Sequence, residues 1–401
     1  MSRPELIGSG VIYRNTNPGY EYSFACHSHL VQLSDRELLC AYQRGQALYA
    51  VDCVCAQSRS IDGGKTWVEE PLMHNSSMDD KAYSYHGPFL TYLGGQSVIA
   101  IVMRIDRSNP KQPLFNEKTG GIFETDTLLL RSGDGGKTWS RPEIIHFPNG
   151  LILTPSCPIV VLRDGRWFLS TDQWHGYDDP GPYKPRTVGL FSSDQGKSWK
   201  DPVTFGVGES QGKGHWHGRI VRLRDDRLFT LFWTAELSPG KNLTLHQCIG
   251  TPDGREWTQP TPTNIPGQTN WPVDLGNGKM AAIYTVRETK PPGFFVTTSD
   301  DGGKTWDIDR QLHVWDATDR DKIGISDLES YPRSHDTIAY GAPSAAVLSN
   351  GDIFLNFWCT EVSVTQIRYA RLRISQAMTR SWRGLPARAE ISRYDGERLG
   401  R

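Results

Sequence analysis

One octapeptide decides the fold of this chain: Ser60-Ile-Asp-Gly-Gly-Lys-Thr-Trp67. Its aspartate suits a tight turn because the carboxylate accepts hydrogen bonds from the turn's backbone amides, and its glycines adopt backbone angles that other residues resist. The threonine and tryptophan then enter the next strand, so each copy predicts a β-hairpin whose tryptophan packs between neighbouring hairpins. The pattern recurs at Ser132–Trp139, Ser193–Trp199 and Ser299–Trp306, and in degenerate form at Thr251–Trp257.

A second repeat alternates with the first and consists of a short apolar strand, a tight turn and a more apolar strand. Together the two repeats give units of four strands, and six such units close into a ring that has no long free sheet edge. We therefore predict an all-β fold, a six-bladed β-propeller, as one domain over residues 1–401 with a C-terminal tail at 376–401. The six copies of the second repeat are Leu30–Asp35, Phe89–Gly95, Ile159–Gly165, Ile220–Asp225, Val273–Gly278 and Ala346–Gly351.

The sixth unit lacks the octapeptide, so its outer strand must come from another part of the chain. Two segments near the chain ends are candidates, Val11–Tyr13 and Ile367–Leu372. Joining the two ends in one sheet would close the ring.

Charge and composition narrow the class of function. The formal net charge is -1, which favours neither nucleic acid nor an acidic membrane surface as a partner. The 13 tryptophans and 40 glycines suit many short strands, tight turns and a sugar-stacking surface better than a helical bundle. The seven cysteines are odd in number and irregular in spacing, which argues against a secreted disulfide framework.

The N-terminus carries no targeting signal that we recognise. Met1–Leu6 lacks the apolar region of a signal peptide, and no apolar run is long enough to span a bilayer. These features predict a cytoplasmic protein with no membrane partner.

Histidines gather where the mouth of a propeller would lie, namely just before each innermost strand and in the loops after the second strands. Six of the 11 histidines fall at these positions. Because histidine titrates near neutral pH, this clustering is the main functional signal in the sequence. The candidate catalytic residues are His27, His29, His86, His217 and Tyr340, and the candidate substrate-binding residues are Arg44, Tyr85, Trp174, His175, His215, Trp216, Arg219, Trp271 and Arg287.

Three interpretations of the histidine pairs stay open. His27 and His29 would share one face of a strand, as would His215 and His217, because strand side chains alternate. Such pairs suit acid–base chemistry at a sugar, or they suit a divalent metal such as zinc or manganese. In the third interpretation they pack the channel as hydrogen-bonded structural residues. No cofactor other than this metal alternative is indicated.

The remaining candidates each have two interpretations. Arg219 is suited to clamp a carboxylate bidentately or to form a salt bridge to a neighbouring blade. Arg287 either begins a substrate loop or pairs with Glu288. Tyr340 is a nucleophile or general acid, or a plain hydrogen-bond donor. The tryptophans would stack on a sugar ring or pack the rim; they are Trp174, Trp216 and Trp271.

The octapeptide is similar to the Asp-box, and the repeated unit resembles a blade of the sialidase (neuraminidase) superfamily of BNR-repeat propellers over roughly residues 20–372. The resemblance implies the six-bladed fold, with the boxes in structural positions on the blade periphery. It also implies that Tyr340 lies near the position of the sialidases' tyrosine nucleophile, at the start of the last blade. Arg44, after the second strand of blade one, matches an arginine that the family often has at that position. The first arginine of the sialidases' carboxylate-binding triad is missing, because the matching stretch reads Cys26-His-Ser-His29.

Three functions follow as alternatives. The first is a glycoside hydrolase acting on an anionic or deoxy sugar, which is favoured because hydrolysis is the common activity of the superfamily. The second is a polysaccharide or oligosaccharide lyase, in which histidine takes a proton, tyrosine protonates the leaving oxygen and arginine neutralises a uronate. The third is a sugar-binding propeller without catalysis. The partner predicted is an anionic carbohydrate; no oligomeric state is indicated.

Overall fold

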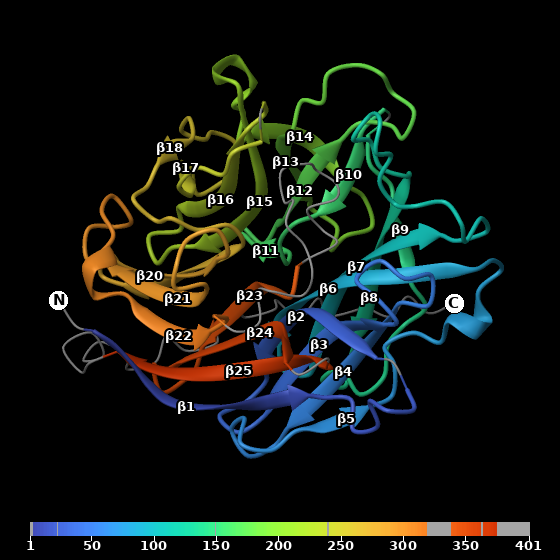
Figure 1. The fold of residues 1–401 in the computed structure, drawn as a ribbon, viewed down its shortest axis with the longest axis horizontal. Coiled ribbons are helices and arrows are strands. Elements are labelled where there is room, and N and C mark those ends of the chain that lie inside the picture. The colour runs from blue at the N-terminus through green and yellow to red at the C-terminus, as the bar shows by residue number, and fades with distance from the viewer. Residues whose placement is uncertain are drawn as a thin grey trace, which may run out of the picture.

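Six β-sheets surround one axis in the computed structural model of this chain (Figure 1). The structure describes residues 3–374, except for residues 22, 149, 239, 319–337 and 362–363. The predicted all-β, six-bladed propeller is confirmed. The predicted C-terminal tail, 376–401, lies outside the described residues.

Each sheet is one blade, and we number the blades along the chain. Blade one contains β2 (Phe24–Gln32), β3 (Leu38–Gly45), β4 (Val54–Ser60) and β5 (Val68–Glu70), and blade two contains β6 (Tyr83–Gly94), β7 (Ser97–Asp106), β8 (Thr125–Ser132) and β9 (Glu143–Ile145). Blade three contains β10 (Ile152–Pro155), β11 (Val160–Val161), β12 (Trp167–Trp174), β13 (Arg186–Ser192) and β14 (Lys200–Phe205), and blade four contains β15 (Lys213–Arg222), β16 (Leu228–Glu236), β17 (His246–Gly250) and β18 (Thr261–Pro262). Blade five contains β19 (Asn270–Gly276), β20 (Lys279–Val286), β21 (Gly293–Ser299) and β22 (Leu312–Asp316), and blade six contains β23 (Tyr340–Val347), β24 (Ile353–Glu361), β25 (Val364–Ile374) and β1 (Pro4–Tyr13). Within the described residues, three single-turn 3-10 helices lie in the connections: η1 (Ser76–Met78), η2 (Glu209–Gln211) and η3 (Ile308–Arg310).

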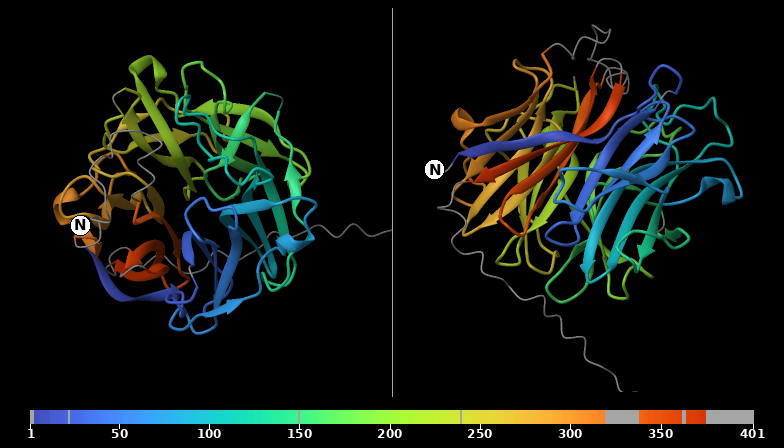
Figure 2. Two further views of the ribbon diagram at one scale, coloured as in Figure 1. Left: turned by 45° about the vertical axis from the view of Figure 1, so that its right-hand side comes forward. Right: turned by 90° about the horizontal axis from the view of Figure 1, so that it is seen from below.

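The two ends of the chain close the ring in blade six. Strand β1 pairs antiparallel with β25 along its whole length, from Pro4 opposite Ile374 to Tyr13 opposite Ile367. Both predicted closing segments therefore contribute: β25 is the third strand and β1 the outermost (Figure 2). The N-terminal strand covers a sheet edge that would otherwise be free.

The octapeptide acts as predicted at the turns. Asp62 accepts the backbone N–H groups of Lys65 and Thr66 at 3.0 Å each and the Thr66 hydroxyl at 2.6 Å. These bonds, the Thr66 hydroxyl foremost, hold the pKa of Asp62 below its ordinary value. In the third copy the serine that contacts the aspartate is Ser192, one residue before the predicted start.

The boxes also join neighbouring blades, because their second glycine packs against the preceding blade. At Gly64 (φ 87°) an added Cβ would lie 2.4 Å from the ring of Phe354 in blade six. At Gly136 (φ 83°) it would lie 2.4 Å from Leu39 in blade one. Trp139 adds a hydrogen bond between blades, from its indole N–H to the side-chain oxygen of Gln57 at 3.0 Å. Both the backbone angle and the close approach require glycine.

All seven cysteines are buried, and no disulfide bond joins any of them within the described residues, as is common for cysteines in a packed core. None of the helices in the described part of the chain has the length and apolar character needed to cross a membrane.

Candidate functional site

A backbone irregularity recurs on the innermost strands of four blades. In each, the regular pairing with the second strand breaks at the same place, between Cys26 and His29 in β2 and at the equivalent points of β6, β15 and β23. One residue in each break has a left-handed backbone, which is uncommon for residues other than glycine and collects at functional sites. These residues are His27 (φ 47°), Gly87 (56°), His217 (56°) and Ala342 (46°).

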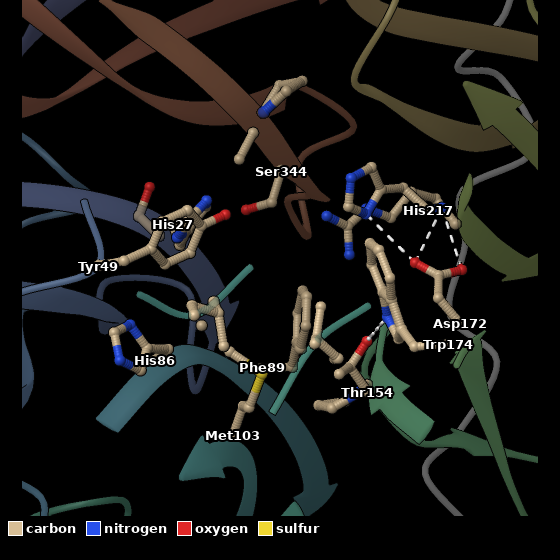
Figure 3. Close-up of a pocket in the computed structure, with 18 of the residues that line it drawn as sticks. His27, Tyr49, His86, Phe89, Met103, Thr154, Asp172, Trp174, His217 and Ser344 are labelled. Atoms are coloured by element: carbon tan, nitrogen blue, oxygen red, sulfur yellow. Dashed lines mark hydrogen bonds and ion pairs between the residues drawn. The ribbon is translucent and has the colours of Figure 1, made fainter. Parts of the chain in front are cut away.

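The four irregular strands line a cavity of about 130 Å³ on the propeller axis, to which all six blades contribute. Figure 3 shows His27 and Tyr49 on one side of it and His217 with Asp172 on the opposite side. Its polar lining consists of His27, Ser28, Tyr49, His86, Thr154, Asp172, His217, Arg219 and Ser344, and its aromatic lining of Phe89, Phe115, Trp174 and Trp271.

Asp172 holds His217 in two ways. Its two carboxylate oxygens each accept the backbone N–H of His217 at 3.1 Å, which supports the left-handed turn at that residue. Its Oδ2 also lies 3.4 Å from His217 Nδ1. A carboxylate facing Nδ1 keeps the proton of neutral imidazole on Nδ1 and leaves the lone pair on Nε2. The His217 side chain is 35% exposed, so it can meet a ligand, whereas Asp172 is buried.

Asp172 reaches the cavity because the innermost strand of blade three is interrupted between β10 and β11. It lies on the second strand, β12, opposite Thr154. Trp174, two residues further on the same face, donates its indole N–H to the Thr154 hydroxyl at 2.9 Å.

Arg219 brings a buried positive charge to the cavity. Its guanidinium lies over the rings of Phe89 and Trp271, at 4.9 and 5.7 Å from their centroids, and donates to the carbonyl of Ser156. Burial lowers the pKa of Arg219, yet an arginine stays cationic at neutral pH. Its Nε–H has no hydrogen-bond partner in the described part of the chain, so the group has donor capacity left for an anion.

The opposite wall contains His27, Tyr49 and His86. His27 Nδ1 lies 3.1 Å from the side-chain oxygen of Gln43, whose amide nitrogen donates to the carbonyl of Leu48. That oxygen can only accept, so Nδ1 of His27 is the donor. His86 is buried and Tyr49 is half-buried, with ring centroids 6.0 Å apart. Burial raises the pKa of Tyr49, which therefore keeps its proton at neutral pH.

The cavity brings together six of the residues predicted from the sequence: His27, His86, Trp174, His217, Arg219 and Trp271. Their catalytic and binding roles stay predictions.

The expected pairing of His27 with His29, and of His215 with His217, does not occur. The irregularity after Cys26 breaks the alternation of side chains, so His29 turns away and its Nδ1 accepts the N–H of Leu90 at 3.1 Å. His215 likewise lies inside blade four, with Nδ1 2.8 Å from the Thr234 hydroxyl. Among the described residues, no group of three His, Cys, Asp or Glu side chains is placed to hold a metal ion.

The other predicted site residues lie outside the cavity lining and contact the protein itself. Tyr340 donates its hydroxyl to the Val286 carbonyl at 2.7 Å, and Arg287 donates to the Tyr340 carbonyl at 2.9 Å, so the pair joins blades five and six. The rest are Arg44, paired with Glu69; Tyr85, bonded to Asp79; Trp216, bonded to Tyr183; and His175, 3.8 Å from Asp179.

Five polar residues of the cavity lining were not predicted from the sequence: Ser28, Tyr49, Thr154, Asp172 and Ser344. Asp172 lies two residues before Trp174, and strand alternation alone would have put the two side chains on one face. Tyr49 lies in the loop after β3, whereas the predicted residue of this region, Arg44, lies within β3 itself. The interruption of the innermost strand, which lets Asp172 line the cavity, has a sequence signal: Pro155 and Pro158 lie at it, and proline has no N–H to donate within a sheet.

Buried histidines predict a fold that weakens in mild acid. Burial lowers the pKa of His29 and His215 to about 3, and that of His86 well below its ordinary value. The unfolded chain takes up these protons below about pH 6.5 and the folded chain does not, so the unfolding free energy should fall as the pH drops from about 6.5 to 4.5. Each histidine contributes up to about 1.4 kcal/mol per pH unit.

Denaturant unfolding across that pH range measures this slope. The variant His215→Asn, which cannot titrate, should have a slope smaller by about one proton. A wild-type stability that stays level over the range would contradict the prediction.

Comparison with known proteins supports the fold. A family model described as the BNR repeat-like domain matches residues 36–355. A protein of unknown function from Dyadobacter fermentans superposes with a TM-score of 0.71 at 19% identity, covering 93% of this chain and 99% of that chain. The NanB sialidase of Streptococcus pneumoniae superposes with a TM-score of 0.60 at 13% identity, covering 91% of this chain and 70% of that chain. The α-L-arabinanase of Penicillium chrysogenum superposes with a TM-score of 0.57 at 15% identity, covering 92% of this chain and 98% of that chain. No protein of curated function matches the chain in sequence.

Proposed function

Since the chain belongs to the BNR repeat-like domain family, we propose that it is a carbohydrate-active enzyme whose site is the axial cavity, and that it cleaves a uronate-containing glycan by elimination. The observation that carries this proposal is the polar content of the cavity. Among the described lining residues, Asp172 is the one carboxylate, and it is already engaged with His217. Most glycoside hydrolases need two carboxyl groups flanking the scissile bond.

Elimination needs a base, a partner for the carboxylate and a proton donor, and the cavity has a candidate for each. Nε2 of His217 takes the proton from the carbon beside the uronate carboxyl group, and Asp172 stabilises the imidazolium that forms. Arg219 faces the carboxylate, where negative charge grows. The C–H electron pair forms the carbon–carbon double bond as the bond to the leaving oxygen breaks. The Tyr49 hydroxyl, which keeps its proton, protonates that oxygen.

Hydrolysis is the second candidate, and Tyr49 favours it. Sialidases are glycosidases with a tyrosine nucleophile, and the superposed sialidase and arabinanase share this fold. Tyr49 lines the cavity on the same side as His27 (Figure 3). In this mechanism Tyr49 is the nucleophile, and His27 is the base that takes its proton.

Product analysis separates the two reactions. The purified protein is incubated with oligogalacturonate, alginate, glucuronoxylan, heparin and chondroitin fragments, with sialyllactose and arabinan alongside, and the products are followed by ultraviolet absorbance and mass spectrometry. We expect an unsaturated uronate, with product masses that add up to the substrate mass. Products that together exceed the substrate by one water would show hydrolysis. If the protein binds one of these glycans and cleaves none of them, it is a sugar-binding propeller without catalysis.

A further inference from the structure

His86 occupies an unusual position in the cavity lining. It lies on the innermost strand of blade two, directly before the left-handed Gly87, and is 1% exposed. Its Nδ1 is buried without a hydrogen-bond partner in the described residues. A buried polar nitrogen without a hydrogen-bond partner destabilises the folded protein, so this atom calls for an explanation beyond packing.

The other ring nitrogen belongs to a chain of hydrogen bonds that begins at a guanidinium. Arg107 Nε–H donates to the Ser84 hydroxyl oxygen at 2.8 Å, and the same oxygen lies 2.8 Å from His86 Nε2. Arginine has no acceptor, so the serine oxygen accepts from Arg107. Among the described residues, Nε2 of His86 is the one acceptor beside the Ser84 hydroxyl, and donation to Nε2 leaves that hydroxyl hydrogen paired. Nε2 therefore accepts, and the ring proton sits on Nδ1. Arg107 is itself held by the Tyr49 carbonyl, at 2.9 Å from its second terminal nitrogen.

The surroundings of His86 keep the ring neutral. Burial is the main cause that lowers its pKa well below the ordinary value, and the neighbouring Arg107 and His27 add to it. The Tyr49 ring, the other titratable group beside it, keeps its own proton. Within the described part of the chain, no acidic residue is among the causes that shift the pKa of His86. His86 is thus poorly suited to carry protons, which was one of the roles predicted for it from the sequence.

We propose that His86 is a specificity residue: a neutral imidazole, fixed as the Nδ1–H tautomer by Ser84 and Arg107, that donates a hydrogen bond to an acceptor oxygen of the bound sugar. The tautomer itself does not depend on the reaction, whereas the identity of the acceptor rests on the proposed function. A site built to bond a ligand oxygen rejects analogues that lack it, because the nitrogen is then left unpaired.

Nuclear magnetic resonance tests the tautomer without any substrate. The protein is labelled with ¹⁵N at histidine, and the His86 signals are identified as those missing in His86→Gln. We expect Nδ1 to carry the proton and Nε2 to be an acceptor, with no change between about pH 8 and 5. Ser84→Ala should let the proton redistribute toward Nε2. A proton on Nε2 in the wild type, or titration near neutral pH, would overturn the proposal.

Ligand binding tests the donor role separately, with free D-galacturonate and D-glucuronate as probes. Binding of at least one should shift the Nδ1 signal. His86→Leu should bind that probe about tenfold more weakly, a loss of about 1.4 kcal/mol, and His86→Asn, which keeps an N–H near Nδ1, should recover most of the affinity. Bound probe with an unchanged Nδ1 signal, or equal affinities in the two variants, would overturn the donor role. If Nδ1 responds but no elimination occurs, the proposed function fails and this proposal stands.

Discussion

Replacing His217 by alanine is expected to lower kcat on the cleaved glycan by about 10²–10⁴-fold, with a melting temperature close to that of the wild type. The side chain is 35% exposed, so its loss leaves no buried cavity. Asp172→Asn should lower kcat to a similar extent, because the amide can donate to Nδ1 and thereby favour the wrong tautomer of His217. Steady-state kinetics together with thermal unfolding measure both effects.

The matched control is His146→Ala, which removes an exposed histidine outside the cavity and should change neither kcat nor stability. His29→Ala should behave differently from the His217 and His146 variants. It removes the acceptor of the buried Leu90 N–H and should therefore lower the free energy of unfolding by about 1–3 kcal/mol. If His217→Ala keeps wild-type kcat, His217 is not the base, and the elimination mechanism fails with it.

Loss of the charge at Arg219 is the second large effect we expect. Arg219→Met should lower kcat/KM on a uronate glycan by about 10²–10³-fold, since truncating one partner of a buried charge pair costs about 2–5 kcal/mol. Arg219→Lys keeps the charge without the planar fork and should recover part of the loss. Binding of free galacturonate, measured by calorimetry, should weaken in parallel.

Arg163→Met serves as the control, because that side chain is 80% exposed and lies away from the cavity. Arg219 also donates to the Ser156 carbonyl, so unfolding must be measured for each variant. A folded Arg219→Met protein with unchanged kcat/KM on a uronate glycan would show that Arg219 does not bind the substrate carboxylate.

The prediction of site residues depended on where strand alternation holds. The rule that side chains alternate placed His27 beside His29, but the irregularity between them sends His29 to the backbone of Leu90. The same rule, applied to β12, would have found Asp172 from Trp174. Tyr340 was predicted from its position before the innermost strand of blade six and from the family resemblance, and its hydroxyl donates to the Val286 carbonyl.

Six hairpin units, their turns and their order around the ring could be read from the amino-acid sequence, because the contacts that define a box lie within five residues of its aspartate. The sequence does not show which side chains meet on the propeller axis. That outcome depends on left-handed residues in four innermost strands and on the break between β10 and β11. Such distortions are supported by partners distant in the chain, as Asp172 supports His217 across 45 residues. Local preferences therefore determine the blades, whereas only tertiary packing determines the cavity.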